Sequence, residues 1–153
     1  MKIKPIGIAL IACGVLAGSF AAHAESDPEN IIKFRQSVMK ANGAHMSAAA
    51  AIVQGKVEYK DRLADHAKAL EMFTKNIPAL FPKGSDFGAD SKALDSVWAK
   101  PAEFEKLAKD TQTKAAAFAK AVAAKDAQLA PKFKELADSC KACHKDFRKE
   151  EKQ

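Results

Sequence analysis

The chain has 153 residues, of which 48% are hydrophobic and 29% are charged, and its formal net charge is +6. This length suits one domain with its own hydrophobic core. Because basic and acidic residues are interleaved rather than gathered in a cationic block, the charge pattern favours a solvated helical surface and argues against nucleic-acid binding.

The first 24 residues have the three parts of an export signal. A basic start is followed by an apolar run over residues 6–20, and Ala22-His23-Ala24 has the small-x-small form of a signal peptidase site. Glycines interrupt the apolar run and no charged flank follows it, so we expect cleavage rather than stable membrane insertion. The sequence therefore predicts a Sec-type signal peptide over residues 1–24, a mature domain over residues 25–153 and a periplasmic location.

A rival processing site lies inside the apolar run. Leu10-Ile11-Ala12-Cys13 resembles the box cleaved in bacterial lipoproteins, which would make Cys13 a lipidated N-terminus. The run continues past this cysteine to a good site, so cleavage after Ala24 is the favoured interpretation. Cys140 and Cys143 are then the only thiols of the mature chain, which excludes a disulfide scaffold or a zinc site with a second cysteine pair.

The first predicted helix begins at Asp27-Pro28, where a capping side chain precedes a proline at the first helical position. It runs to about Gln54-Gly55, where glycine supplies the stop. Gly43 inside this helix costs about 1 kcal/mol relative to alanine, and close approach of a flat ligand would explain it. Steps of three and four residues place one set of side chains on the inner face: Ile32, Arg35, Met39, Asn42, Met46, Ala49 and Val53.

The second helix is predicted from about Lys60 to Asn76, and Pro78 ends it. Residues 78–90 contain two further glycines and another proline, so they are expected to form the one long crossover loop. Residues 91–98 are a candidate for a short helical turn before the next main element.

Lys100-Pro101 opens the third predicted helix, and the fourth begins near Asp126. Both carry apolar side chains at helical spacing, and no part of the mature chain shows the alternation of a strand. Four amphipathic helices without strands predict an all-α fold, an antiparallel four-helix bundle in one domain.

Cys140-Lys141-Ala142-Cys143-His144 lies inside the fourth predicted helix. Two cysteines separated by two residues and followed by histidine form the attachment pattern for c-type haem, in which each thiol adds to a porphyrin vinyl group and the imidazole binds iron. At roughly 100° per residue, Cys143 and His144 point within about 60° to either side of Cys140. We therefore expect one haem c inside the bundle, held from the C-terminal helix.

Other interpretations of this motif are weaker. A thioredoxin-like CxxC site expects strands and helices around it, and a zinc site would need further ligands. A haem-free periplasmic helical protein with an accidental motif stays open as an alternative.

Three stretches resemble the class II c-type cytochromes, the family of cytochrome c′ and its low-spin relatives. They are Lys33-Phe34-Arg35-Gln36-Ser37, Val97-Trp98 with Phe104 following, and Cys140 to His144 continuing through Phe147-Arg148. The resemblance implies a periplasmic four-helix bundle with one covalent haem and His144 as its proximal ligand. It also implies that Arg35 pairs with a haem propionate, for which an exposed ion pair is the alternative.

Met39 matches the residue that faces the distal side of the haem in this family. Members with methionine there are either low-spin proteins whose sulfur binds iron or high-spin ones whose site stays open. Met39-Lys40-Ala41-Asn42-Gly43 looks more like the low-spin branch, because Asn42 and Gly43 lack bulk that would hold the helix away. We therefore expect Met39 as the second axial ligand of the iron beside His144.

Two axial ligands leave no place for a substrate, so the favoured function is a periplasmic carrier of single electrons between redox partner proteins. The alternative is a five-coordinate, high-spin cytochrome c′ that binds nitric oxide or other small gases. The sequence shows no catalytic constellation, so we do not expect an enzyme. By resemblance, a homodimer is one candidate assembly.

Several other side chains have structural interpretations. Met46 and Met72 are expected to fill the core. His45 and His66 are expected on the surface or between helices, and Trp98 and Phe104 over a haem edge or the core.

Overall fold

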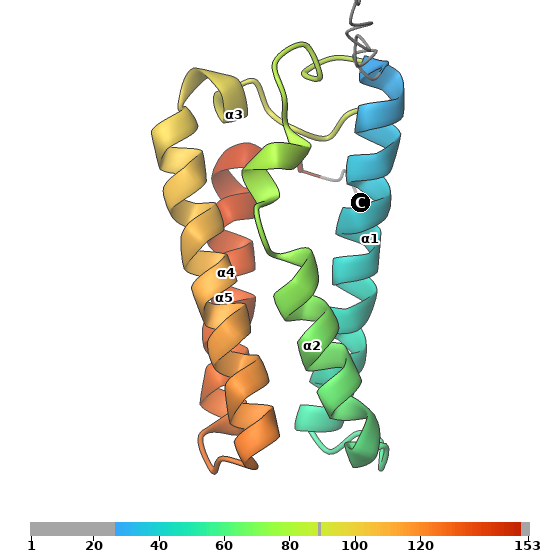
Figure 1. Cartoon of the computed structure of the whole chain (residues 1–153), viewed down its shortest axis with the longest axis vertical. Coiled ribbons are helices and arrows are strands. Elements are labelled where there is room, and N and C mark those ends of the chain that lie inside the picture. The colour runs from blue at the N-terminus through green and yellow to red at the C-terminus, as the bar shows by residue number, and fades with distance from the viewer. Residues whose placement is uncertain (1–26, 89, 151–153) are drawn as a thin grey trace, which may run out of the picture.

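The computed structural model describes residues 27–88 and 90–150, and it arranges them as a bundle of helices (Figure 1). The four main helices run antiparallel to one another in chain order, as the blue-to-red colouring shows. The bounds of the helices are α1 Pro28–Val53, α2 Leu63–Phe73, α3 Ser96–Ala99, α4 Pro101–Ala124 and α5 Leu129–Phe147. The predicted all-α four-helix bundle is therefore confirmed.

The first helix begins and ends as its sequence predicts. The Asp27 side chain accepts a hydrogen bond of 2.7 Å from the backbone N–H of Glu29. Pro28 occupies the first turn, where its missing N–H leaves no bond unmade. Gly55, just beyond the helix, has a positive φ of 67°, which glycine adopts without strain. α1 thus has fixed ends, and its inner face keeps one orientation along the bundle.

Two clusters of buried side chains form the core. The first core cluster lies where α2 packs against α1 and α4. Its buried members are Ala49, Ile52, Leu63, Ala67, Leu70, Ala115, Phe118, Phe133 and Leu136. The second core cluster lies at the α3 end, and its buried members are Ile77, Ala93, Val97, Phe104, Ala108 and Phe147.

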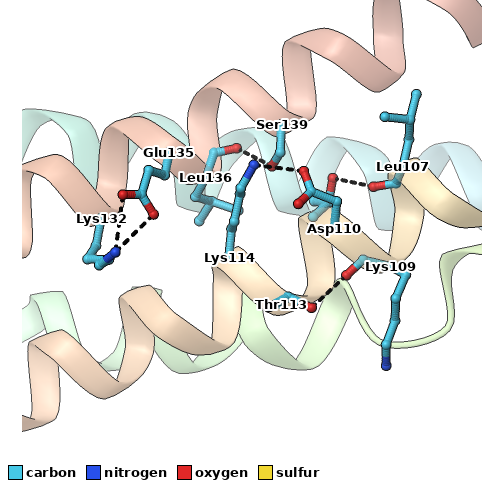
Figure 2. Close-up of polar contacts among 10 residues, drawn as sticks. Leu107, Lys109, Asp110, Thr113, Lys114, Lys132, Glu135, Leu136 and Ser139 are labelled. Atoms are coloured by element: carbon cyan, nitrogen blue, oxygen red, sulfur yellow. Dashed lines mark hydrogen bonds and ion pairs between the residues drawn. The ribbon is translucent and has the colours of Figure 1, made fainter.

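Helices α4 and α5 bury two hydroxyl groups between them. Thr111 donates to the carbonyl of Leu107 at 3.0 Å. Ser139 donates to the carbonyl of Leu136 at 2.7 Å (Figure 2). Because each hydroxyl is bonded within its own helix, it can be buried without cost from an unpaired donor. Ion pairs lie on the outer faces of these helices, for example between Lys114 and Asp110 at 2.8 Å.

Hydrogen bonds from α3 and to the end of α5 hold the crossover between α2 and α4. Trp98 donates from its indole nitrogen to the carbonyls of Phe81 and Pro82, each at 3.1 Å. The backbone N–H of Leu94 donates to the carbonyl of Phe147 at 3.0 Å, next to an isolated antiparallel bridge. The crossover is thereby attached to the end of α5.

The second helix differs from its predicted extent. Its α-helical part is shorter, and 3₁₀ turns flank it at η1 Lys60–Arg62 and η2 Ile77–Leu80. Asn76 adopts a left-handed conformation with φ of 54°, which separates α2 from η2 before Pro78 is reached. The short turn predicted over residues 91–98 is found later, at α3.

Met72 corrects one prediction about the core. Its side chain was expected to pack, but it is 57% exposed. It follows the inner-facing Leu70 by two positions, which turns it toward the opposite side of the helix. Its position beside Phe73 in the sequence therefore does not place Met72 on the inner face of α2.

The predicted leader and Cys13 lie outside the described residues and remain predictions. Within residues 27–88 and 90–150, no helix has the length and apolar character needed to cross a membrane.

Candidate functional site

A cavity of about 810 Å³ lies between the two core clusters. Such a volume falls in the range of small-molecule and cofactor sites. The inner faces of α1 and α5 supply much of its wall, and both clusters contribute to it, the first through Leu70 and Leu136 and the second through Phe104 and Phe147. The cavity is therefore built into the core rather than added at a loop.

Cys140, Cys143 and His144 all line this cavity. The two cysteines are free thiols and are partly buried, Cys140 against the first core cluster and Cys143 against the second. His144 belongs to the last turns of α5, where it lines the cavity while the residue remains exposed to solvent. The predicted inward orientation of the CxxCH motif is confirmed.

The surroundings set the protonation of these three groups. Burial raises the pKa of the Cys140 thiol. The pKa of Cys143 rises to about 11, mainly through burial and also through Cys140 and Asp146. Burial, with a further contribution from Arg148, lowers the pKa of His144. At neutral pH the thiols therefore stay protonated, and the imidazole keeps the lone pair that a metal ligand needs.

The inner face of α1 forms the cavity wall with both apolar and polar groups. Met39 lines the cavity and packs against the second core cluster, as Cys143 does. Asn42 lies one turn further along, and its Oδ1 is the one buried side-chain polar atom in the described part of the chain that has no hydrogen-bond partner. The wall therefore combines a thioether with a single unsatisfied amide oxygen.

Arg35 also lines the cavity, and it is only 4% exposed. Its two terminal nitrogens make four hydrogen bonds to the crossover. They reach the Leu80 carbonyl at 3.2 Å, the Ser85 hydroxyl and carbonyl at 2.9 Å each, and the Ser91 hydroxyl at 3.2 Å. The guanidinium also lies 4.5 Å from the centre of the Phe81 ring.

These contacts correct one of the two predictions made for Arg35. The exposed ion pair is wrong, because the side chain is buried and its partners are neutral oxygens. Burial lowers the pKa of the guanidinium, but an arginine stays charged. A pairing of Arg35 with a haem propionate remains a prediction.

Comparison with known proteins places this site in context. Residues 30–148 match the family model described as Cytochrome C'. The chain belongs to the cytochrome c′ family. Among its relatives, cytochrome c′ of Pararhodospirillum photometricum is 36% identical over 124 residues, which cover 80% of this chain and 99% of that protein.

Solved structures agree with this assignment. Cytochrome c′ from Thermochromatium tepidum has a TM-score of 0.75 and 27% identity, and the match covers 83% of this chain and 100% of the other. A nitric oxide complex of a mutant cytochrome c′ from Alcaligenes xylosoxidans has the same TM-score and 26% identity, covering 83% and 99%. The four-helix bundle is thus that of cytochrome c′.

Cytochrome c′ proteins bind one covalently attached haem c per chain, and the cavity fits this group. Two thiols and an imidazole offer the donor set that such a haem needs. Gly43 lies in the wall, and a Cβ built there would meet no protein atom within 4 Å. The absence of a side chain at Gly43 keeps this stretch of α1 open beside the cavity, and the close approach of a flat ligand there remains a prediction.

Ser85 and Ser91 hold Arg35 in the cavity wall, and the sequence did not predict this role. Both are buried, at 0% and 7% exposure, and both accept hydrogen bonds from Arg35. The available signal was Arg35 itself, because an arginine on an inner helical face needs acceptors from another segment. The crossover, rich in glycine and proline, was the segment long enough to supply them.

The remaining candidates agree with their structural interpretations. Met46 packs against the first core cluster and reaches the cavity wall. Phe104 is buried in the second core cluster, and Trp98 packs against that cluster. His45 and His66 meet between α1 and α2, as one of the two interpretations predicted.

Proposed function

We propose that this protein is a haem c protein that binds nitric oxide or another small uncharged gas. The observation that carries this proposal is a largely apolar cavity with the CxxCH motif in its wall, in a chain whose relatives are cytochromes c′. One of the similar solved structures is a nitric oxide complex. These comparisons support the gas-binding alternative better than the electron carrier that the sequence led us to favour.

In this proposal Cys140 and Cys143 attach the haem through thioether bonds, and His144 provides the proximal ligand. All three belong to α5, so the group is fixed to one rigid element. When bound, the haem supplies an iron atom that can take a gas as ligand and can change its oxidation state. The lowered pKa of His144 keeps its imidazole neutral and available for this role.

The α1 wall determines what can reach the remaining side of the site. The side chains that the two core clusters contribute to the cavity wall are apolar, so entry of a hydrated ion would cost desolvation energy. Small uncharged gases lose little desolvation energy when they enter such a cavity. The unsatisfied Oδ1 of Asn42 adds one polar point to this wall.

A second candidate function rests on Met39. Its thioether lies in the cavity wall, where it is available as a second axial ligand. Methionine opposite histidine raises the reduction potential of a c-type haem and fills both axial positions. The protein would then carry single electrons, and a gas would have to displace the sulfur before it could bind.

The visible spectrum of the haem-loaded protein and of Met39→Leu separates the two functions. Leucine keeps the volume and removes the sulfur. We expect a high-spin spectrum for the oxidised natural chain, ready binding of carbon monoxide after reduction, and little change in Met39→Leu. Met46→Leu, in the same helix, serves as the matched control.

The opposite pattern would establish the electron carrier instead. In that case the natural chain would be low-spin, nitric oxide would bind slowly in stopped-flow mixing, and only Met39→Leu would become high-spin.

We also propose that the protein works in the periplasm, exported by its predicted signal peptide, as a carrier or gas binder and not as an enzyme. Periplasmic redox partner proteins and a homodimer belong to the same proposal. Mass spectrometry of the mature chain tests its start: cleavage after Ala24 gives Glu25 as the first residue, whereas a diacylglyceryl group on Cys13 would contradict the proposed processing.

A further inference from the structure

Helices α1 and α2 bring two histidines together away from the haem cavity. The Nδ1 atoms of His45 and His66 lie 3.0 Å apart, and their ring centroids are separated by 5.3 Å. Both rings are partly buried, and neither belongs to the cavity wall. The pair is therefore a separate feature of the molecule.

A single proton or metal ion can bind to both imidazoles at once. At this distance one ring must donate a proton and the other must accept it, so a single proton lies between two lone pairs. A metal ion that prefers imidazole nitrogen can replace that proton if it lies to one side of the line between the two nitrogens. The pair is consequently prearranged for an ion that accepts two nitrogens at once.

We propose that His45 and His66 form a two-histidine binding site for divalent copper or nickel. Two nitrogens 3.0 Å apart, each about 2.0 Å from one ion, subtend an angle of roughly 97° at the metal. That angle is near the 90° or so between adjacent corners of a square plane, the geometry typical of Cu²⁺ and Ni²⁺. A tetrahedral zinc ion, at about 109°, would need the rings to move apart.

The surroundings hold both ligands in place. The His45 ring stacks on Phe73 of α2, with centroids 6.1 Å apart and an angle of 26° between the planes. His45 lies in the interior of α1 and His66 in the first turn of α2, and the two helices pack directly against each other. Ligands on rigid, packed elements lose little freedom when they bind an ion, which favours affinity.

In the described part of the chain, no group of three or more His, Cys, Asp or Glu side chains is arranged around one metal position. The site therefore offers two protein ligands, and water would complete the coordination. Because both rings are partly exposed, a hydrated ion can reach them. Such an ion would bridge α1 and α2 and remain exchangeable with solvent.

Calorimetric titration of the haem-loaded mature protein with copper(II) chloride tests this proposal. We expect one equivalent to bind at this site, with electron paramagnetic resonance showing two equatorial nitrogens. His45→Gln and His66→Gln should each weaken binding at least about tenfold, the lower end of what even outer-shell changes cost at metal sites. Magnesium chloride should give no binding at this site, since Mg²⁺ prefers oxygen ligands.

A relocated histidine provides the matched control. Ala44 is exposed, and the double variant Ala44→His with His45→Ala keeps the number of histidines but turns the imidazole by roughly 100° around the helix. This variant should lose the two-nitrogen signal. Circular dichroism and the haem spectrum should stay unchanged in every variant, because neither histidine lines the haem cavity.

Two results would overturn the proposal. One is equal copper affinity in the natural chain and in the double variant His45→Gln with His66→Gln. The other is a resonance spectrum of the natural chain that shows one nitrogen or none, a measurement that requires no variant to fold.

Discussion

Arg35 shows how one side chain can organise a segment far from it in sequence. It holds the crossover through four hydrogen bonds while its guanidinium lies against Phe81. Hydrogen bonds from a charged donor are among the stronger ones in proteins. When the donor is removed, a buried acceptor cannot bond to water instead. The stability of the cavity's α3 end should therefore depend on this residue more than on any surface charge.

We expect Arg35→Met to lower the free energy of unfolding by about 2–4 kcal/mol, because it removes four hydrogen bonds from a charged donor and leaves the buried Ser85 carbonyl without that donor. Urea denaturation of the haem-loaded protein measures this change. Lys33→Gln, on the same helix, removes only an exposed pair with Glu29 and should leave the midpoint unchanged. Equal midpoints for the natural chain and Arg35→Met would show that the hydrogen bonds contribute nothing.

At the scale of an element, the end of α4 carries a strained residue. Lys125 follows the helix in a left-handed conformation with φ of 52°, where its N–H bonds to the Val122 carbonyl at 3.1 Å. Glycine is the usual residue at such a helix end, since other residues pay about 1–2 kcal/mol for this conformation.

Lys125→Gly should therefore stabilise the protein by about 0.5–1 kcal/mol, after the greater flexibility of glycine in the unfolded chain is subtracted. Lys120→Gly makes the same chemical change inside α4 and should destabilise by about 1 kcal/mol. Thermal unfolding of the two variants should show shifts of opposite sign. Shifts of the same sign would mean that the conformation of Lys125 is not strained.

Most of the fold could be predicted from the sequence because helix periodicity and end signals are local. The inner face of α1, the cap at Asp27 and the orientation of Cys140 and His144 all follow from spacing. The docking of Ser85 on Arg35 could not be predicted, because it joins residues 50 positions apart. Met72 failed for a different reason, since it lies about 200° around the helix from the buried Leu70.

The choice between a gas and Met39 at the iron is likewise not a matter of spacing. The same residue in the same place permits either, and the balance depends on how freely the α1 wall can move toward the cavity. Similarity to cytochromes c′, one of them solved as a nitric oxide complex, favours a gas ligand, whereas the residues alone favour Met39.

For the whole molecule, the position of the cavity between two core clusters divides the bundle into unequal parts. The first core cluster is built from all four main helices and includes Phe118 and Leu136, both 0% exposed. The second is smaller and consists of a crossover, a short helix and two helix ends. A haem bound in the cavity would contact both core clusters, so removal of the haem should affect the two clusters differently.

We expect the haem-free double variant Cys140→Ala with Cys143→Ala to remain helical around the first core cluster and to lose protection around the second. Hydrogen exchange followed by mass spectrometry, compared with the haem-loaded natural chain, measures this difference. Peptides from residues 74–99 should exchange much faster, whereas peptides from residues 112–124 should change least. Uniform loss of protection along the chain would show that the bundle folds as one unit only with its haem.

The attachment of the crossover also sets an order of events during folding. Arg35 reaches Ser91 across 56 residues, and Lys149 reaches the Ser91 carbonyl across 58. Loops of this length close late, because closing them costs conformational entropy before the contact forms, whereas neighbouring helices can pair early. The α3 end should therefore close after the helices have paired, which leaves the cysteines accessible while haem is being attached and encloses them afterwards.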